Sequence, residues 1–231
     1  MDTVPTVDPA MDAQPSALVV HAHPEPDSFA SSQMRAAVEE LRRSGHSVRV
    51  LDLYADGWNP VLDRSEFPPL DGPFKPQAEQ MRAVREGALS AEVRAHLDAV
   101  LSAELLVLSF PLWWFSMPAI LKGWIDRVFV MGAVFGGEFG LFDRAALHGR
   151  RAMALITTGG PEEAFAAGGA FGALDQFLFH VHRGMLEFVG YEPLPPVVTY
   201  APARMTEAER EASLSAVRDA FAGIGVSAAR L

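Results

Sequence analysis

Three short stretches of this sequence carry residue types that suit a phosphorylated cofactor with a flat ring. They are residues 23–29 (HPEPDSF), 111–115 (PLWWF) and 157–160 (TTGG). Each one directly follows an apolar run that is typical of a buried strand. Because ligands in open α/β sheets bind outside the carboxyl ends of the strands, we expect the three stretches to meet in one site.

The first stretch supplies polar groups at the start of a predicted helix. The hydroxyl of Ser28 and the backbone N–H groups beside it could bind a phosphate. Ser28 is also explained as a simple helix N-cap. His23 could donate to the same phosphate, or it could be a satisfied histidine at a strand end.

The second stretch places Trp113, Trp114 and Phe115 in a loop bounded by Pro111 and Pro118. Aromatic runs usually pack in a core, but two prolines fix this loop in place and leave it partly accessible. In the third stretch, two glycines let backbone N–H groups approach a planar ring closely. Each signal alone is weak, whereas all three at successive strand ends favour a cofactor site.

Alternating strands and helices must position these loops. Hydrophobic patterns predict strands over residues 17–22, 47–52, 105–110, 153–156 and about 195–200. Helices are expected between Ser28 and Gly45 and over residues 77–85, 90–102, 118–129, 174–189 and 206–222. This order predicts a single doubly wound α/β domain over residues 17–231, with a long surface excursion at 54–76. Residues 1–16 lack periodicity and are predicted to be a disordered tail.

Composition excludes several classes of protein. The 231 residues are 49% hydrophobic and 21% charged, as in ordinary globular chains. The net charge of −10 disfavours nucleic-acid and anionic-membrane binding. The absence of cysteine excludes disulfides, thiolate zinc sites and a cysteine nucleophile. His180 and His182 would lie on different faces of a helix, so no metal site is expected there.

Neither a targeting segment nor a membrane span is expected. The first basic residue is Arg35, so the start of the chain does not have the pattern of a signal peptide. The longest uncharged apolar run, residues 105–121, is just short of a membrane span and contains two prolines. We therefore expect a cytoplasmic protein that does not insert into membranes.

These residues resemble the flavin-dependent NAD(P)H:quinone oxidoreductases, which have a flavodoxin-like fold and work as homodimers. The similarity covers about residues 18–214 and is most specific at 22–29, 52–64, 110–129 and 156–160. The resemblance implies a flavodoxin-like sandwich, with a five-stranded parallel sheet and helices on both faces. It also implies a homodimer.

The resemblance assigns a role to each matched residue. His23, Ser28 and Phe29 would hold the pyrophosphate side of the cofactor, and residues 111–115 one edge of its isoalloxazine ring. Matches to adenosine contacts at Arg210 and Leu214, and to a position reaching the partner subunit at Lys75, favour FAD over FMN. The cofactor-binding residues implied in this way are His23, Ser28, Phe29, Pro111, Leu112, Trp113, Trp114, Phe115, Thr157, Thr158, Gly159, Gly160 and Arg210.

Several positions depart from the family pattern. Phe165 and Phe171 stand where the family has a Tyr and a His that stabilise charge during hydride transfer, and neither ring can donate a hydrogen bond. No tyrosine occurs in residues 133–142, where the family has two that close the partner's substrate pocket; Phe139 or Phe142 could fill that space. The substrate-binding residues expected are Trp114, Phe115, Gly159, Gly160, Phe139 and Phe188.

The resemblance implies a ping-pong reaction. NAD(P)H would reduce the flavin and leave, and a quinone or similar flat acceptor would then take both electrons at the same face. Two alternatives remain, both motivated by Phe165 and Phe171. One is a specialised reductase of nitro, azo or polycyclic substrates. The other is a non-catalytic, flavin-loaded regulatory subunit of a transporter.

Overall fold

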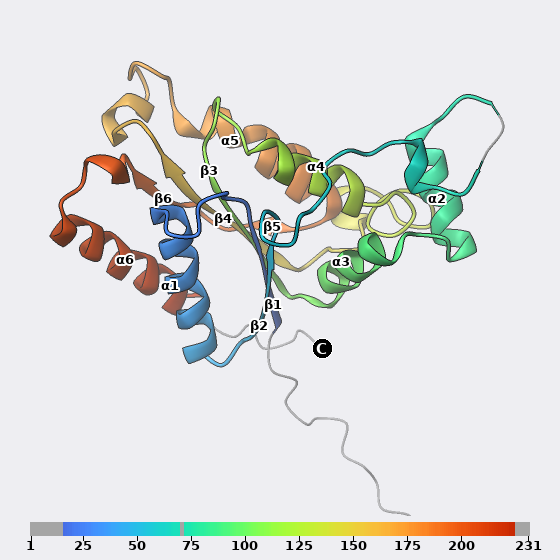
Figure 1. Ribbon diagram of the computed structural model, residues 1–231, viewed down its shortest axis with the longest axis horizontal. Coiled ribbons are helices and arrows are strands. Elements are labelled where there is room, and N and C mark those ends of the chain that lie inside the picture. Colours follow the sequence, from blue (N-terminus) through green and yellow to red (C-terminus); the bar gives the residue numbers. More distant parts are fainter. Residues whose placement is uncertain (1–15, 70–71, 225–231) are drawn as a thin grey trace, which may run out of the picture.

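A parallel sheet forms the centre of the computed structural model, which describes residues 16–69 and 72–224 (Figure 1). The strands in spatial order are β2 (Ser47–Asp52), β1 (Ser16–His21), β3 (Leu105–Pro111) and β4 (Arg151–Thr158). The short β5 (Glu192–Pro193) and β6 (Val197–Tyr200) both pair with β4 along its free edge. Every pairing is parallel, so the carboxyl ends of the strands meet at one edge of the sheet.

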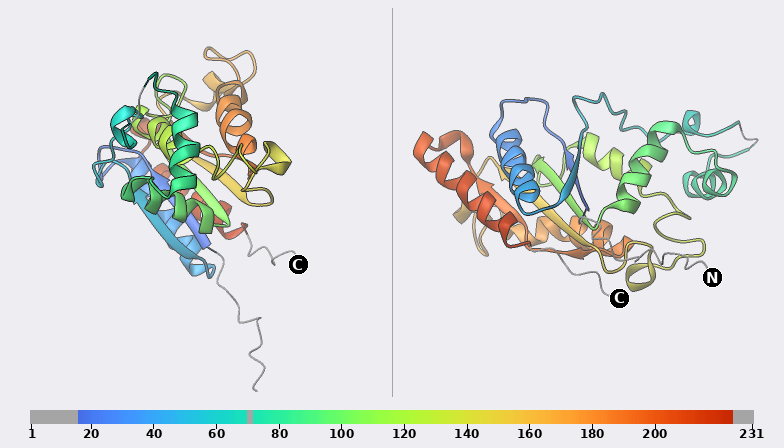
Figure 2. Two further views of the ribbon diagram at one scale, coloured as in Figure 1. Left: turned by 90° about the vertical axis from the view of Figure 1, so that its right-hand side faces the viewer. Right: turned by 90° about the horizontal axis from the view of Figure 1, so that it is seen from below.

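Helices cover both faces of the sheet. The first face packs against α1 (Phe29–Arg43) and α6 (Glu207–Ala222). The second face packs against α3 (Ala91–Ser102), α4 (Ala119–Val128) and α5 (Leu174–Val181). The remaining helix, α2 (Pro76–Glu86), lies at one end of the molecule, away from the sheet (Figures 1 and 2). The arrangement is the doubly wound α/β fold that the sequence predicts.

Burial on both faces explains the unbroken apolar runs. In β1, Ala17 and Val19 join the cluster with α1 and α6, whereas Leu18 and Val20 join the cluster on the opposite face. A strand that is covered on both sides needs apolar residues at every position, unlike a half-exposed strand. The apolar runs therefore mark the central strands.

The fifth predicted strand, over about residues 195–200, is present as β6 and begins two residues later than expected. Pro195 and Pro196 precede it, and proline has no backbone N–H to donate to a neighbouring strand. The short β5, before these prolines, was not predicted, so the sheet in the described residues has one strand more than the five expected.

The predicted helix over residues 174–189 also changes character part-way. Regular α-helix ends at Val181 and continues as a π-helical turn, His182–Leu186, and then a 3-10 turn, Glu187–Val189. The chain leaves this helical segment at Gly190, whose φ of 105° favours glycine. Hydrophobic periodicity correctly predicts the length of the segment but cannot show its change of pitch.

The predicted surface excursion at residues 54–76 is packed more closely than expected. Trp58 and Phe67 within it are buried. The Arg127 guanidinium of α4 lies 4.4 Å from the Trp58 ring centroid and donates to the Glu66 carboxylate at 2.6 Å. This segment is therefore fastened to α4.

Two predicted boundaries change at the chain ends. β1 begins at Ser16, so the last residue assigned to the predicted tail belongs to the sheet. The other tail residues, 1–15, lie outside the described part of the chain. At the other end, α6 has the expected capping box: Thr206 accepts from the Glu209 backbone N–H, and the Glu209 carboxylate accepts from the Thr206 N–H.

Candidate functional site

The three predicted loops meet at the carboxyl ends of β1, β3 and β4, where they enclose a cavity of about 460 Å³. We call it the strand-end cavity. The loop after β6 completes its wall, a contribution that sequence reasoning missed. The lining residues are His23, Pro111, Leu112, Trp113, Trp114, Thr157, Thr158, Gly159, Pro202 and Ala203.

The aromatic loop forms a tight turn with a strained backbone. Trp113 and Ser116 exchange two backbone hydrogen bonds, at 2.9 and 3.0 Å. Trp114 and Phe115 between them have φ angles of 52° and 58°, in the left-handed region. Such values are rare for large side chains and cost on the order of 1–2 kcal/mol per residue. Trp114 is 96% exposed at the tip of this turn.

Phe115 is held on the inner side of the turn by other aromatic rings. It stacks on Phe177 of α5 with ring centroids 4.5 Å apart. Phe171 and Phe165 meet it edge-on, at 5.6 and 6.3 Å. Phe165 also lies 6.0 Å from the Tyr200 ring at the end of β6. The departures at Phe165 and Phe171 thus form one phenylalanine cluster around Phe115.

The two glycines of the third stretch have different surroundings. A Cβ built on Gly159 would meet nothing within 4 Å, so open space borders the backbone there. A Cβ on Gly160 would lie 2.6 Å from the Phe171 ring. Gly159 therefore permits a ligand to approach the backbone, whereas Gly160 makes room for the phenylalanine cluster. Thr158 closes this loop by donating to the Gly160 carbonyl at 2.8 Å.

His23 Nδ1 contacts the backbone of Glu25. It lies 3.0 Å from the Glu25 nitrogen and 3.2 Å from the Glu25 carbonyl oxygen, so the tautomer of the ring decides whether Nδ1 accepts or donates. In the tautomer whose Nδ1 accepts, Nε2 carries the proton and can donate it to another group. His23 also lies 6.0 Å from the Trp113 ring, so it faces the aromatic loop across the strand-end cavity.

Ser28 is the N-cap of α1, as the simpler of its two readings predicts. Its Oγ accepts from the Ser31 backbone N–H at 3.1 Å. No acidic residue occupies the first turn of α1. The Arg210 guanidinium of α6 lies 6.0 Å from the Phe29 ring. The start of α1 therefore combines a helix N-terminus with a nearby cation, a setting that favours an anion.

A buried histidine that sequence reasoning missed joins the elements beneath the cavity. His21 ends β1, with its Nδ1 3.0 Å from Ser109 Oγ of β3 and its Nε2 3.1 Å from Ser31 Oγ of α1. Burial lowers the pKa of His21 to about 4, although Asp52 opposes the shift. The neutral ring therefore fixes α1 against the sheet. The only signal in the sequence is a polar residue at the end of an apolar run.

Comparisons with known proteins agree with this geometry. The model of the flavodoxin-like fold family matches residues 15–222. The human ribosyldihydronicotinamide dehydrogenase [quinone] is 38% identical over 202 residues, which cover 86% of this chain and 87% of that protein. The chain belongs to the flavodoxin-like quinone reductase family.

Two further members of this family are similar over most of the chain. A ribosyldihydronicotinamide dehydrogenase-like protein, traD, from Penicillium crustosum is 39% identical over 192 residues, covering 79% of this chain and 72% of its own. The crystal structure of a candidate quinone reductase from Klebsiella pneumoniae superposes with a TM-score of 0.84 at 35% identity. That match covers 90% of this chain and 83% of the other.

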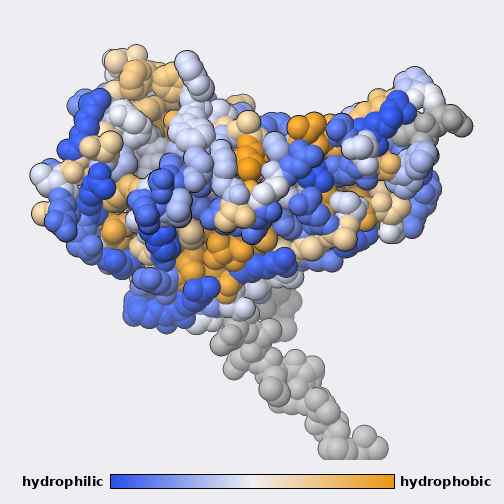
Figure 3. Space-filling model, in the orientation of Figure 1, coloured by the Kyte–Doolittle hydropathy of each residue, from blue (hydrophilic) through white to orange (hydrophobic). Residues whose placement is uncertain are grey.

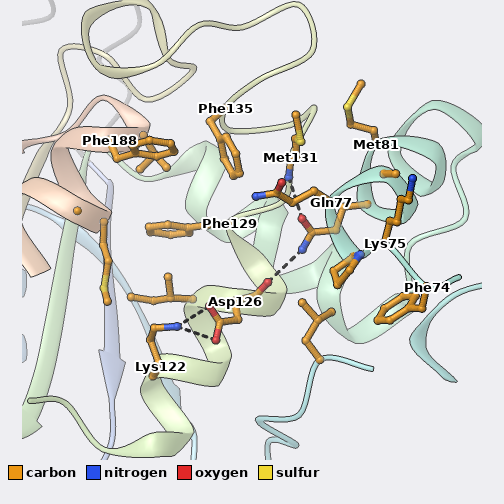
Figure 4. Close-up of a pocket in the computed structure, with 18 residues that line it drawn as sticks. Phe74, Lys75, Gln77, Met81, Lys122, Asp126, Phe129, Met131, Phe135 and Phe188 are labelled. Carbon is orange, nitrogen blue, oxygen red and sulfur yellow. Dashed lines mark hydrogen bonds and ion pairs between the residues drawn. The ribbon is translucent and has the colours of Figure 1, made fainter. Parts of the chain in front are cut away.

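A second cavity, of about 940 Å³, lies between α2, α4 and the π-helical turn after α5 (Figure 4). We call it the α2 cavity. Phe129, Phe135 and Phe188 lie on one side of it, and Phe74 and Lys75 on the other (Figure 4). The α2 cavity and the strand-end cavity share no lining residue.

The predicted substrate-binding residues therefore do not all lie in one cavity of the chain. Phe188 lines the α2 cavity, where its ring lies 5.4 Å from Phe135 and 5.6 Å from Phe142. Phe139 is partly exposed and lines neither cavity. Leu214, a predicted adenosine contact, packs against the core beside α1. In residues 133–142, which lack tyrosine, Phe135 lines the α2 cavity together with Phe188, whereas Phe139 does not.

No helix in residues 16–69 or 72–224 is long and apolar enough to cross a membrane. The end of the molecule formed by α1 and α6 is mostly hydrophilic in the face shown in Figure 3.

Proposed function

We propose that this chain is a flavin-dependent NAD(P)H:quinone oxidoreductase that holds FAD at the strand-end cavity and follows a ping-pong order. The observation that carries the proposal is the left-handed turn at Trp114 and Phe115, beside the open backbone at Gly159. Strain of this kind persists where a ligand site requires it. An exposed tryptophan and a bare backbone that line the same cavity suit a flat ring.

The surrounding groups fit the rest of such a cofactor. The ring of His23 and the N-terminus of α1 would supply donors for a diphosphate. The position of Arg210 beside Phe29 supports FAD over FMN, because FMN has no adenosine to reach it. The cavity volume lies within the range of cofactor pockets, roughly 300–1,000 Å³.

When bound, the flavin supplies two-electron transfer chemistry. Trp114 and Phe115 would stack on the flat ligands that use its open face in turn, NAD(P)H first and the acceptor second. Thr157, Thr158 and Gly159 would line its polar edge, where negative charge develops on reduction. The phenylalanine cluster would exclude water from the ring of the acceptor.

We further propose that a second copy of the chain completes the acceptor site. The α2 cavity presents Phe135, which falls in the segment where the family has the partner's tyrosines, and Lys75, which matches a position that reaches the partner subunit. It also presents Phe188, a predicted wall of the acceptor pocket. These residues line a cavity that shares no residue with the strand-end cavity of their own chain, so we place them at the acceptor of another chain. The proposed assembly is a homodimer with two equivalent sites.

A second candidate function is reduction of nitro, azo or polycyclic aromatic compounds. The packing of Phe165 and Phe171 around Phe115 favours it, because the wall there offers shape and apolar surface but no donor from either ring. A screen of simple quinones against larger aromatic acceptors separates the two functions. Turnover of the larger compounds alone would select the second.

Cofactor identity is tested on the purified protein. Heat should release a flavin that co-elutes with FAD, and stripped protein should rebind FAD more tightly than FMN. Arg210→Ala should weaken FAD binding about tenfold and leave FMN binding unchanged. Arg204→Ala, in the 3-10 turn before α6, serves as the matched control for charge. Equal affinity for the two flavins, or release of FMN, would contradict the FAD assignment.

A further inference from the structure

The strained aromatic turn is attached to α5 by two contacts outside its own backbone. Ser116 Oγ, at the end of the turn, forms a hydrogen bond of 3.0 Å with His180 Nε2. Phe115 stacks on Phe177, with an interplanar angle of 22°. Residues three apart on a helix share a face, so Phe177 and His180 both contact the turn from the same face of α5.

Trp114 has no such support of its own. It is 96% exposed, and its φ of 52° is held only by the neighbours on either side. A turn with two left-handed residues relaxes to a less strained form unless the surroundings hold it in place. The orientation of the Trp114 ring therefore depends on the contacts of Phe115 and Ser116.

We propose that the Ser116–His180 hydrogen bond is a latch that holds the aromatic turn in its left-handed form, which makes His180 a positioning residue for the acceptor. This inference rests on the proposed function, because it assigns the turn to acceptor binding. His180 acts through Ser116 and lines neither cavity. Without the latch, only ring contacts of Phe115 and the backbone pair of Trp113 and Ser116 hold the turn, and Trp114 samples other orientations.

The hydrogen bond between positions 116 and 180 requires particular residue types at both positions. Position 116 needs a hydroxyl, and position 180 needs a group that can bond it across the gap between the turn and α5. Glutamine can bond a hydroxyl through its amide and has similar reach, whereas alanine cannot. His180→Gln should therefore preserve the latch that His180→Ala removes.

The test compares Ser116→Ala, His180→Ala, His180→Gln and the double alanine variant, all in full-length, flavin-loaded protein. Each alanine variant should raise the KM of the acceptor about fivefold to tenfold and raise the KM of NAD(P)H as well, because both ligands would stack on this turn. The double variant should match the single ones, since both remove the same bond. His180→Gln should restore the KM. Gln176→Ala, exposed on the same helix, is the control and should behave as wild type.

A readout independent of turnover is near-ultraviolet circular dichroism of the flavin-free protein. Trp58 and Trp124 are buried, so a change in the tryptophan bands on breaking the latch reports on Trp113 and Trp114. The bands should weaken in Ser116→Ala and His180→Ala and recover in His180→Gln. Unchanged bands with an unchanged KM would overturn the latch. If wild type shows no turnover but the bands respond as expected, the latch stands and the proposed function fails.

Discussion

At the scale of single residues, two features stand out: the strained backbone at Trp114 and Phe115, and the buried ring of His21. Trp114 and Phe115 are adjacent, and both have positive φ, whereas the other non-glycine residues with positive φ in the described ranges, Phe142 and Ala201, are isolated. Left-handed conformations are tolerated at a functional site because the rest of the fold offsets their cost. The strain of the aromatic turn is therefore what the proposed ligand site would explain.

Replacing Trp114 tests this account of strain. Trp114→Gly and Trp114→Ala both remove an exposed ring, but only glycine removes the left-handed strain. We expect the glycine variant to exceed the alanine variant by about 1 kcal/mol in free energy of unfolding, measured with urea. At Ala212, an exposed residue of α6, glycine should instead lower the free energy of unfolding relative to alanine. If Trp114→Gly were less stable than Trp114→Ala, the backbone at position 114 would not be strained.

His21 makes stability depend on pH. Burial lowers the pKa of His21 to about 4 from an ordinary 6.5, so the folded protein holds the ring neutral while the unfolded chain takes up a proton below pH 6.5. The contribution of this group is complete above pH 6.5 and is lost as the pH falls toward 4, by about 3 kcal/mol in all.

His21→Gln should remove that dependence. The free energy of unfolding of wild type minus that of the variant should fall by about 3 kcal/mol between pH 7 and pH 4, in denaturant titrations at each pH. Carboxylates titrate alike in both proteins, so the difference isolates His21. Parallel curves for the two proteins would show that the ring is not held neutral.

At the scale of elements, one close contact fixes α4 against the segment that crosses it. A Cβ on Gly123 would lie 2.1 Å from the Pro60 carbonyl oxygen. Backbone cannot shift as easily as a side-chain end, so even a methyl group forces the two segments apart.

Gly123→Ala should therefore lower the free energy of unfolding by about 1–3 kcal/mol, although alanine is the better helix former. The control is Gly159→Ala, which meets open space and should leave the stability of the flavin-free protein nearly unchanged. Thermal unfolding of the two flavin-free variants measures the contrast. A stabilised Gly123→Ala variant would mean that α4 does not approach Pro60 so closely.

The same scale shows which features the sequence could predict. Periodicity located the central strands and α1, α3, α4 and α6, because both sheet faces are buried and the helices are amphipathic. It could not predict the two-residue strand β5 or the π-helical turn, because the first is too short to show a pattern and the second is a change of pitch. The three loops were predicted to meet, and they do. His21, Tyr200 and the Ser116–His180 bond were missed, because isolated polar residues have no pattern until the chain folds.

At the scale of the whole molecule, the strand-end cavity and the α2 cavity share no lining residue. If both serve one reaction, we expect the strand-end cavity of one chain to meet the α2 cavity of a second chain. Phe129, Phe135 and Phe188 form an apolar wall of the α2 cavity (Figure 4). Burial of such a wall against another copy would stabilise an assembly in which each chain closes its partner's site.

Phe188→Asp tests that assembly. A charge in a buried interface should weaken self-association at least a hundredfold, so the protein should sediment as a monomer at concentrations where wild type is a dimer. Ala212→Asp adds the same charge on α6 and should remain dimeric. Should wild type itself sediment as a monomer, the shared acceptor site would have to be abandoned.

The most direct test of the central claim is an anaerobic titration of the purified protein, as isolated, with NADPH and then NADH, following the visible absorbance of its flavin. We expect a yellow protein that bleaches with about one equivalent of reductant per flavin and regains its colour when a quinone is added. A yellow protein that stays oxidised with both nucleotides would contradict the reductase assignment and favour a regulatory flavoprotein instead.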